Sequence, residues 1–545
     1  DLLTDTDINN KRDEPFPDDY QNRPLIVLGS INTNRVLLPL YARFFCATDA
    51  AFPGGAGYEL RTMVNPYGTE SNIILLGGST IEGVGRAVRR FIGLIDEAAE
   101  HDTLTLPFLL EVEPGIEMAR RMAEWPDPAY KVSGDIPGDS KRPKTLGEWP
   151  STSRDMPIPE TDGGLISVIG PYAILYAWTG ERKYGQYAAD CLRKLNTQVE
   201  DSYGDWHYAI ERIVRAVPWL ASGGFLDADE RLLTDQLLLG TALATHGMWW
   251  RKRNGRPPLG HRHHGKGTFA FYLQARYLRD QARPNETARE LCDRWIDECR
   301  AFLDALAQAR ADDQDDESTL NNLTTVFWYA LGEERFDFFE SGNALAVTER
   351  AIAIHDNMGA GAGVEGYGEG LPGSMYLQQD ISVIVGASAY YYQDGQLKWV
   401  REHMPNLREP TRMILWVMSP AFMHRFDVGP EVVSEPPRRL EGLRALDLSP
   451  YQVDLVSDPP NYRPPDDVGV QDAEKWQFHN GLRPNGLPFE RTFDKLVMRK
   501  SFDPQAPYLL LQGYDEPFRW QGSMHAANAI VRFSQGGHIF LVQNT

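Results

Sequence analysis

The region from Gly163 to about Pro430 constrains the fold most, because its apolar residues recur at helical spacing almost throughout. Gly, Pro and Asn interrupt this pattern only in short links. About ten to twelve helices with short links predict helical hairpins that close into an (α/α) toroid. No fixed repeat period recurs, which excludes the simple repeat families. The expected helices span 164–178, 183–199, 206–221, 229–249, 267–281, 286–309, 321–331, 344–355, 379–392, 396–403 and 411–418.

Residues 1–124 have a different pattern, which predicts a small α/β domain. After a polar arm, the segments RPLIVLGS, YELRTMVNPYG and SNIILLGGS predict strands, whereas residues 33–46 and GVGRAVRRFIGLIDEAA predict helices. The glycines of LLGGSTIEGVGRA fit neither the GxGxxG fingerprint nor a P-loop, so we expect them to allow tight packing at a helix start. Residues 125–162 are rich in Pro, Gly, Ser and Asp and predict a linker.

The last region, residues 433–545, predicts strands. Prolines become frequent near Pro436, and KLVMRKS, YLLLQGY, NAIVRFS and HIFLVQNT then have the composition and length of strands in an antiparallel β-sandwich. So few strands would leave an open edge, and we expect further strands beyond Thr545. The predicted class is multidomain α+β. The expected order is an α/β accessory domain (1–124), a linker (125–162), a toroid (163–432) and the start of a sandwich (433–545).

Composition excludes several partners and cofactors. A formal net charge of −21 argues against a nucleic-acid partner. No apolar run is long enough to span a membrane, so we expect no membrane association. Cys46, Cys191, Cys292 and Cys299 lack CxxC spacing, which excludes zinc-ribbon and thioredoxin motifs. We therefore expect four buried free thiols.

One stretch, GYGEGLPGSMYLQQDISVIVGASAYYY at 366–392, predicts a carbohydrate site. Its glycines allow the backbone to approach a ligand closely. The aromatic side chains that follow supply faces for sugar stacking and titratable hydroxyls. The candidates here are Tyr376, Gln379 and Tyr390.

Further candidate residues lie elsewhere in the chain. In GDWHYAIER the candidates are Trp206, Tyr208 and Glu211. In GHRHHGKG, histidines and a lysine open a helix, whose N-terminus adds positive potential suited to a carboxylate. The residues concerned are His263, His264 and Lys266, followed later in the chain by His424, Arg425 and His525.

The domain order and these motifs resemble the polysaccharide lyases of the heparinase, chondroitin lyase and alginate lyase groups. Tyr58–Phe91 is similar to the N-terminal α/β domain of α-glucuronidases and β-N-acetylhexosaminidases. GDWHYAIER is similar to the W-x-Y-E-I-G-x-P helix of hyaluronate and chondroitin lyases, and PGSMYLQQD with GASAYYY to their DGSFxQH…GAYG segment. The segment GSMHAANAIVRFSQGGHIFLVQNT resembles the heparinase II/III-type GHxDANSI sequence. The family histidine of the second motif falls on Gln378 or Gln379 here.

The resemblance implies β-elimination at a uronic acid in an acidic polysaccharide. Histidine, lysine and arginine (His263, His264, Lys266 and Arg425) would neutralise the carboxylate, and Tyr390, Tyr376, His264 or His525 would exchange the C5 proton. Trp206, Tyr208, Glu211, Gln379 and His424 would bind the sugar. The family often binds a structural divalent metal in the sandwich, but its aspartates are Ala527 and Gln543 here. A polymeric substrate implies a secreted or periplasmic protein.

Two alternatives stay open at this stage. A glycoside hydrolase on the same toroid would use a pair of carboxylates, for which Glu365, Glu369 and Asp380 are available. A non-catalytic glycan-binding protein would use the same tyrosines and histidines without turnover. Product analysis separates them, because a lyase alone leaves an unsaturated sugar that absorbs in the near-ultraviolet.

Overall fold

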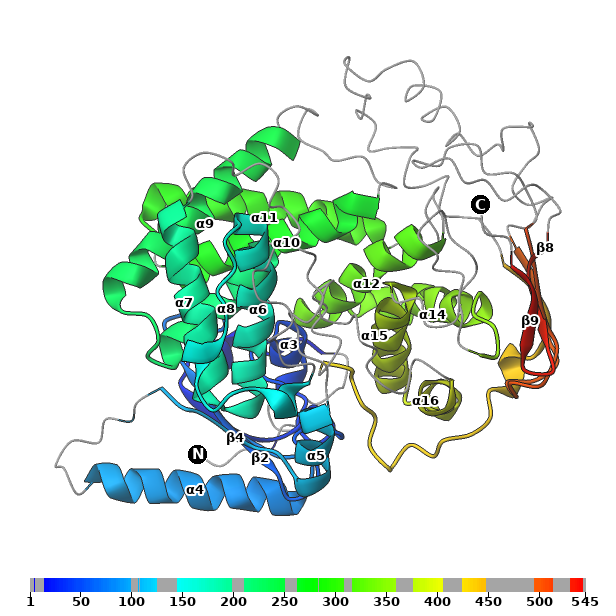
Figure 1. Cartoon of the computed structure of the whole chain (residues 1–545), viewed down its shortest axis with the longest axis horizontal. Helices are drawn as coiled ribbons and strands as arrows, with labels where there is room; N and C mark the ends of the chain where they lie inside the picture. Colours follow the sequence, from blue (N-terminus) through cyan, green and yellow to red (C-terminus); the bar gives the residue numbers. More distant parts are fainter. Residues whose placement is uncertain are drawn as a thin grey trace.

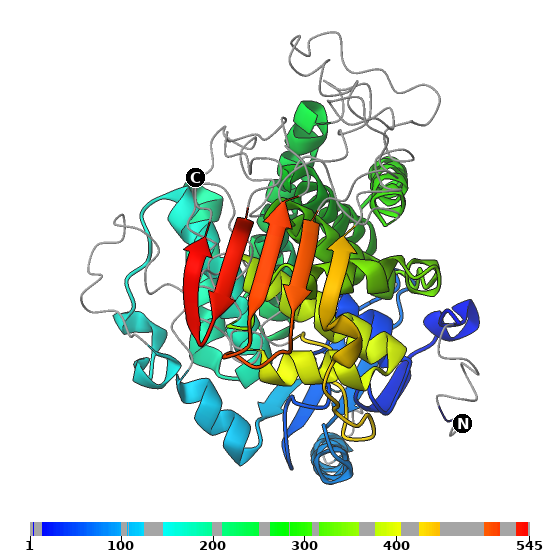
Figure 2. The same cartoon turned by 90° about the vertical axis from the view of Figure 1, so that its right-hand side faces the viewer.

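The computed structural model describes eleven continuous ranges of the chain and two isolated residues. The ranges are 14–99, 108–124, 145–198, 210–249, 262–282, 284–307, 316–358, 376–404, 424–446, 495–512 and 530–542, and the isolated residues are 4 and 106. For some residues within the helices, the structure describes the backbone but not the side chain. They form a mixed α+β structure with a four-stranded sheet, a large group of helices and a five-stranded sheet (Figures 1 and 2).

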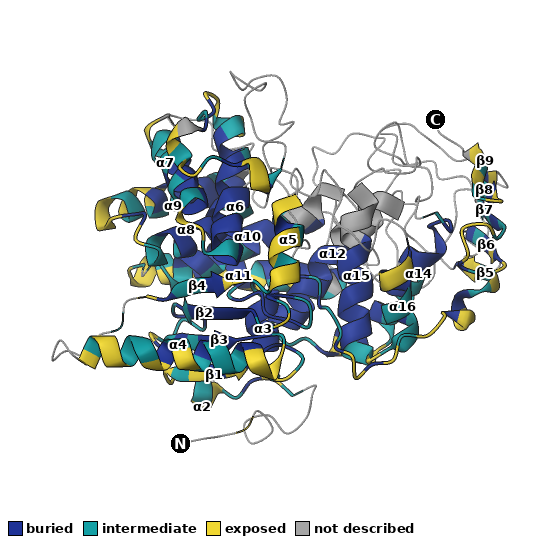
Figure 3. Ribbon diagram, turned by 60° about the horizontal axis from the view of Figure 1, so that its bottom comes forward, coloured by how far each residue is buried: buried dark blue, intermediate teal, exposed yellow. Residues whose placement is uncertain are grey.

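The N-terminal region is built on a sheet of strand order β1-β3-β2-β4. Strand β1 is parallel to β3, and β2 is antiparallel to both β3 and β4. One face packs against α4 through Leu60, Leu76 and Phe91, and α4 turns its other side to solvent (Figure 3). The elements are α2 (Asp18–Gln21), β1 (Leu25–Gly29), α3 (Leu37–Ala42), β2 (Tyr58–Met63), β3 (Ile73–Gly77), α4 (Ile81–Ala99), β4 (Leu110–Glu113) and α5 (Ile116–Glu124).

The glycine motif of this region serves packing, as the sequence predicts. A Cβ atom on Gly83, in the first turn of α4, would overlap the carbonyl oxygen of Gly57 in the loop before β2. A Cβ on Gly78 would similarly overlap the backbone of Gly83 and Val84. Only glycine lets the helix start approach the sheet this closely.

The helices form two layers. The first layer consists of helices that contact one another in succession, α6, α8, α10, α12 and α15. The second layer packs against the first and consists of α7, α9, α11, α14 and α16. Helix α6 is buried on nearly every side, from Leu165 to Trp178, because its sequence is apolar all round. The helices are α6 (Asp162–Thr179), α7 (Arg182–Gln198), α8 (Ile210–Ser222), α9 (Ala228–Trp249), α10 (Arg262–Asp280), α11 (Glu286–Leu306), α12 (Asp316–Gly332), α13 (Asp337–Glu340), α14 (Asn343–Ala353), α15 (Tyr376–Tyr392) and α16 (Gly395–His403).

The helices of the first layer share one direction, because their C-terminal ends meet the N-terminal region. Hydrogen bonds join Arg61 to the Ala177 carbonyl of α6, Asn65 to the Asp280 carbonyl of α10, Phe16 to Glu334 just after α12, and Tyr390 of α15 to the Ile31 carbonyl. Helix α8 runs the same way, because the carbonyl of Gly223 after its end accepts a 3.0 Å bond from Arg182, just after the end of α6. The N-terminal ends of all five helices therefore point away from the N-terminal region.

The C-terminal region is an antiparallel sheet of order β5-β6-β7-β8-β9 that packs beside α14 (Figure 2). Arg499 donates to Asn357 at 2.7 Å and to the Ile352 carbonyl at 3.0 Å, and the Tyr508 hydroxyl donates to the Ala353 carbonyl at 2.8 Å. The strands are β5 (Gly442–Leu446), β6 (Lys495–Arg499), β7 (Tyr508–Gln512), β8 (Ile530–Gln535) and β9 (His538–Val542). Within the described ranges this is a single layer.

Most expected elements are confirmed, as is the mixed α+β class. Nearly every expected helix lies within a few residues of an observed one, and the expected segment 411–418 lies outside the described residues. The sequence analysis missed α2, β4, α5, α13 and β5. All four cysteines are buried free thiols, as expected.

Candidate functional site

Three of the predicted stretches lie at the N-terminal ends of parallel helices. Glu211 is in the first turn of α8, His263, His264 and Lys266 are in the first turn and a half of α10, and Tyr376 opens α15. Because α8, α10 and α15 are parallel members of one layer, the structure brings these three starts to the same end of the helical region. The first backbone N–H groups of an α-helix have no partner within the helix, so this end presents donors and positive potential.

The strands of the C-terminal sheet have a defined direction relative to α15. Arg439, just before β5, pairs at 2.8 Å with Asp394, which caps the start of α16 just after α15 ends. Strand β5 therefore runs from the C-terminal end of α15 toward its N-terminal end. Because neighbouring strands are antiparallel, β8 begins on that far side, at Ile530 shortly after His525 (Figure 1).

The other members of the predicted set are not all described. Trp206, Tyr208 and His525 lie outside the described residues, as do Glu365 and Glu369 of the hydrolase alternative. For six positions in helices α10 and α15 the structure gives the backbone but not the side chain. These are His263, His264, Lys266, Tyr376, Gln379 and Asp380.

Tyr390 does not join this group. It lies in the last turn of α15, at the opposite end of the helix from Tyr376, and is 4% exposed. Its hydroxyl donates a 2.6 Å hydrogen bond to the carbonyl of Ile31 in the N-terminal region. This placement gives Tyr390 a structural role and argues against the catalytic role expected from the sequence.

His424 and Arg425 also lie at the junction with the N-terminal region. The His424 imidazole is 1% exposed, lies 2.6 Å from the Cys46 carbonyl through Nε2, and packs against the rings of Tyr41 and Phe44. The backbone carbonyl of Arg425 accepts a hydrogen bond from Arg401. The sugar-binding role predicted for His424 does not fit a ring enclosed in this way.

Glu211 is the predicted residue whose side-chain environment is described most fully. Its carboxylate lies 3.4 Å from Nη2 of Arg215, one turn further along α8, and is 17% exposed. Arg215 is 6% exposed and lies over the ring of Phe44, with its guanidinium carbon 3.7 Å from the ring centroid. Burial lowers the pKa of Arg215, and the charge of Glu211 opposes that effect.

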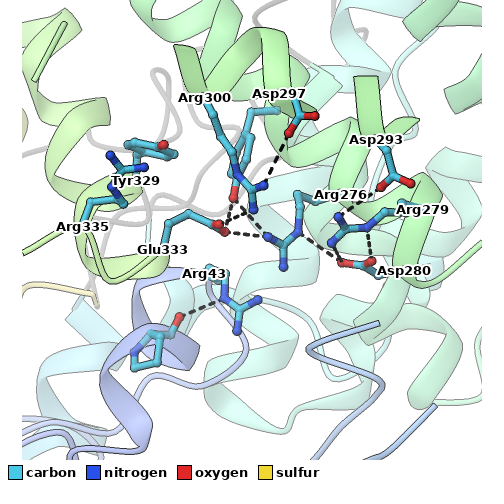
Figure 4. Close-up of polar contacts among 12 residues, drawn as sticks. Arg43, Arg276, Arg279, Asp280, Asp293, Asp297, Arg300, Tyr329, Glu333 and Arg335 are labelled. Atoms are coloured by element: carbon cyan, nitrogen blue, oxygen red, sulfur yellow. Dashed lines mark hydrogen bonds and ion pairs between the residues drawn. The ribbon is translucent and has the colours of Figure 1, made fainter. Parts of the chain in front are cut away.

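A second charged cluster, which the sequence analysis did not identify, lies at the C-terminal ends of α10 and α12. Figure 4 shows Arg276 and Arg300 turned toward Glu333, each with a nitrogen 2.7 Å from a carboxylate oxygen. The Tyr272 hydroxyl also donates to Glu333. Burial alone would raise the pKa of Glu333, but Arg276, Arg300 and Arg43 outweigh it and lower the pKa to about 2.

Beside this cluster lies a pocket of about 80 Å³ between the N-terminal region, α8 and α10. Arg43, Arg215, Trp219, Arg276 and Asp280 are among its lining residues. The motif RIVRAVPWL carries a usable signal for it, because Arg215 is the one charged residue between Ile213 and Leu220. No local sequence pattern predicts that Arg43 lines the same pocket as Arg215, because that proximity arises only from tertiary packing.

The described residues contain no group of histidine, cysteine and acidic side chains arranged to hold a metal ion. Within the same ranges, every helix is too short or too polar to cross a lipid bilayer. In comparisons with known proteins, no family model and no curated protein sequence matches this chain. The functional argument therefore depends on the residues and their geometry.

Proposed function

We propose that this chain is a polysaccharide lyase that cleaves a uronic-acid-containing glycan by β-elimination. In this proposal the two helix layers belong to an (α/α) toroid, and the C-terminal sheet is one layer of a β-sandwich. The protein is secreted or periplasmic and acts on an acidic polysaccharide. The observation that carries the proposal is the common direction of α8, α10 and α15, whose N-terminal ends carry three of the lyase-like stretches.

The helix ends suit the substrate's charge. A carboxylate at the N-terminal end of a helix gains from the partial positive charge there and from unpartnered backbone N–H donors. His263, His264 and Lys266 add cationic side chains within the first turns of α10. This local concentration matters because the chain as a whole carries a net charge of −21, which repels an acidic polymer elsewhere on the surface.

The chemistry requires two linked events at the uronic acid. Neutralising the C6 carboxylate makes the C5 proton acidic enough for a base to remove. The C4–O bond then breaks, a C4=C5 double bond forms, and the leaving oxygen takes up a proton. We assign the proton exchange to Tyr376, because it opens α15 at the helix N-terminal end whereas Tyr390 is buried at the other end. Cations nearby would lower the pKa of its phenol from the usual value near 10.

The first test is a screen of purified protein against uronate polysaccharides, read by absorbance in the near-ultraviolet. Heparin-like, chondroitin-like, alginate-like and rhamnose–glucuronate polymers form the panel. Growth of absorbance with chain cleavage is the expected result on at least one polymer. Cleavage without absorbance would identify a hydrolase, and binding without cleavage would identify a non-catalytic glycan-binding protein.

A matched pair of variants then tests the assignment of the base. Tyr376→Phe should lower kcat by about 10²- to 10⁴-fold, the usual contribution of a positioned acid or base. Tyr390→Phe removes the same hydroxyl from the same helix but at its opposite end, where that hydroxyl binds the Ile31 carbonyl, so kcat per folded molecule should stay near the wild-type value. If Tyr390→Phe abolishes turnover while Tyr376→Phe retains it, the assignment is wrong.

A further inference from the structure

The guanidinium of Arg215 is buried with little compensation. Its side chain is 6% exposed, and its only polar contact within the described ranges is the 3.4 Å approach of Nη2 to Glu211. Nε and Nη1 have no hydrogen-bond partner there. A buried charged group with unsatisfied donors is costly, and native proteins normally supply a counter-ion or bound solvent for it.

Arg215 also borders a pocket. The pocket of about 80 Å³ is lined by Arg215 and Trp219 of α8, Arg43 of the N-terminal region, and the last turns of α10. This space is large enough for a few water molecules or one small oxyanion.

The charges around the pocket favour the oxyanion. Three arginines line it, against one carboxylate, Asp280. Asp280 is already occupied by Arg276 at 3.2 Å and by Arg279 (Figure 4). Arg43 donates to the carbonyls of Pro39 and Pro66 but leaves Nη2 without a partner among the described residues.

Three nearby acids interact with these arginines without lining the pocket. Glu333 is held by Arg276 and Arg300 and also interacts electrostatically with Arg43. Glu334 likewise interacts with Arg43, and Glu211 pairs with Arg215. The lining itself is cationic, and Arg43 and Arg215 keep donor nitrogens without a hydrogen-bond partner among the described residues.

We propose that this pocket binds a small oxyanion, a phosphate, sulfate or carboxylate group, through Arg215 and Arg43. Charge-assisted bonds from a guanidinium to such an anion are about twice as strong as neutral ones. The bound anion would join α8 and α10 to the N-terminal region, because each contributes lining residues. Arg215 also pairs with Glu211 at the start of α8, but the inference does not depend on the function proposed for the helix N-terminal ends.

The test is calorimetric titration of the intact chain with sodium phosphate, sodium sulfate, sodium acetate and sodium glucuronate at constant ionic strength. Saturable binding of at least one of these anions is expected, and the panel identifies which anionic group is preferred. Arg215→Met keeps the packing over Phe44 but removes the charge, and it should weaken binding by about 10- to 100-fold. Arg120→Met removes one charge from an exposed site and should leave binding unchanged.

A structural measurement keeps the proposal testable if the Met variant unfolds. Arg215→Lys retains the charge but replaces the planar guanidinium with its five donors by an ammonium with three, so it should also bind more weakly than the wild type. Crystals grown in the preferred anion should show it bonded to Arg215 Nε or Nη1. Titrations without saturable heat for any anion, or crystals with only water on those nitrogens, would overturn the proposal.

Discussion

Glu333 offers the sharpest quantitative test of what holds the N-terminal region to the helices. Its carboxylate is 11% exposed and binds Arg276, Arg300 and Tyr272. Its pKa is lowered from 4.5 to about 2, because the arginine charges outweigh the effect of burial. At about 1.36 kcal/mol for each pH unit, this difference corresponds to about 3 kcal/mol of folding stability at neutral pH.

The perturbation is Glu333→Gln. The amide is nearly isosteric but uncharged, so it leaves Arg276, which is 14% exposed, and the more exposed Arg300 without their shared counter-ion. Removing one partner of a buried ion pair typically costs about 3–5 kcal/mol, in agreement with the value obtained from the pKa. We therefore expect the variant to be about 3 kcal/mol less stable than the wild type at pH 7.

The pH dependence has a defined sign. The folded-state pKa lies below the unfolded one, so the stabilisation is present above pH 4.5 and is lost as the pH falls toward 2. The difference between wild type and variant should shrink from about 3 kcal/mol at pH 7 to about half of that at pH 3.

Urea unfolding followed by circular dichroism at pH 7, 4 and 3 measures this difference. Glu117→Gln is the matched control, because Glu117 also pairs with an arginine but is exposed to solvent. It should leave the unfolding midpoint unchanged at every pH. A loss below about 1 kcal/mol at pH 7 for Glu333→Gln, or a loss independent of pH, would refute the reasoning.

Two further predictions concern the junction and the helix layers. Asp49 is buried near Asp427. Its burial, and to a lesser extent the charge of Asp427, raise the pKa of Asp49 to about 7. Ionisation of Asp49 therefore destabilises the fold as the pH rises from 4 to 7. Urea titrations of Asp49→Asn should show it gaining stability relative to the wild type over that interval, and a pH-independent difference would contradict this. A Cβ on Gly386 would overlap the Arg425 carbonyl, so Gly386→Ala should cost about 1–3 kcal/mol in thermal unfolding. Gly93→Ala meets nothing and should stabilise α4 by about 0.5–1 kcal/mol, and equal effects of the two substitutions would refute the packing argument.

The sequence predicts the helices well because their burial is periodic. Each long helix presents an apolar face to its neighbours, and this face appears in the sequence as apolar residues every three to four positions. The elements that it missed have weaker signals. Strand β4 is the sequence Leu-Glu-Val-Glu at a sheet edge, and β5 is five residues with mostly exposed side chains. Such short elements are stabilised by their partner strands more than by their own pattern.

The orientation of individual side chains was not predictable. Tyr390, Tyr391 and Tyr392 are consecutive, so they project about 100° apart around α15. Tyr390 bonds to Ile31, Tyr391 stacks on Phe339 with centroids 4.3 Å apart, and the Tyr392 hydroxyl donates to the Phe339 carbonyl at 2.6 Å. All three partners are distant in sequence or lie on another element. A local motif shows that tyrosines are present, but tertiary packing decides which of them can reach a substrate.

The same limit applies to the predicted sandwich. On the sheet face away from α14, Leu443, Met498 and Leu541 occupy one row of the strand register and are each at least 40% exposed. An apolar row of this kind on a sheet is typical of a face that another layer covers. The described residues contain no such layer, so the sandwich stays a prediction while the antiparallel sheet itself is observed.

The two ends of the helical region differ electrostatically for one structural reason. At the C-terminal ends, where carbonyl groups lack helical partners, the N-terminal region supplies donors from Arg61 and Asn65. Docking there satisfies the negative ends of the parallel helices, and it leaves their positive ends on the opposite side. A chain with a net charge of −21 thereby keeps one end suited to anions. If the proposed lyase function holds, the N-terminal region needs no catalytic residue of its own to influence the site, because it docks on the C-terminal helix ends and leaves the N-terminal ends for an acidic substrate.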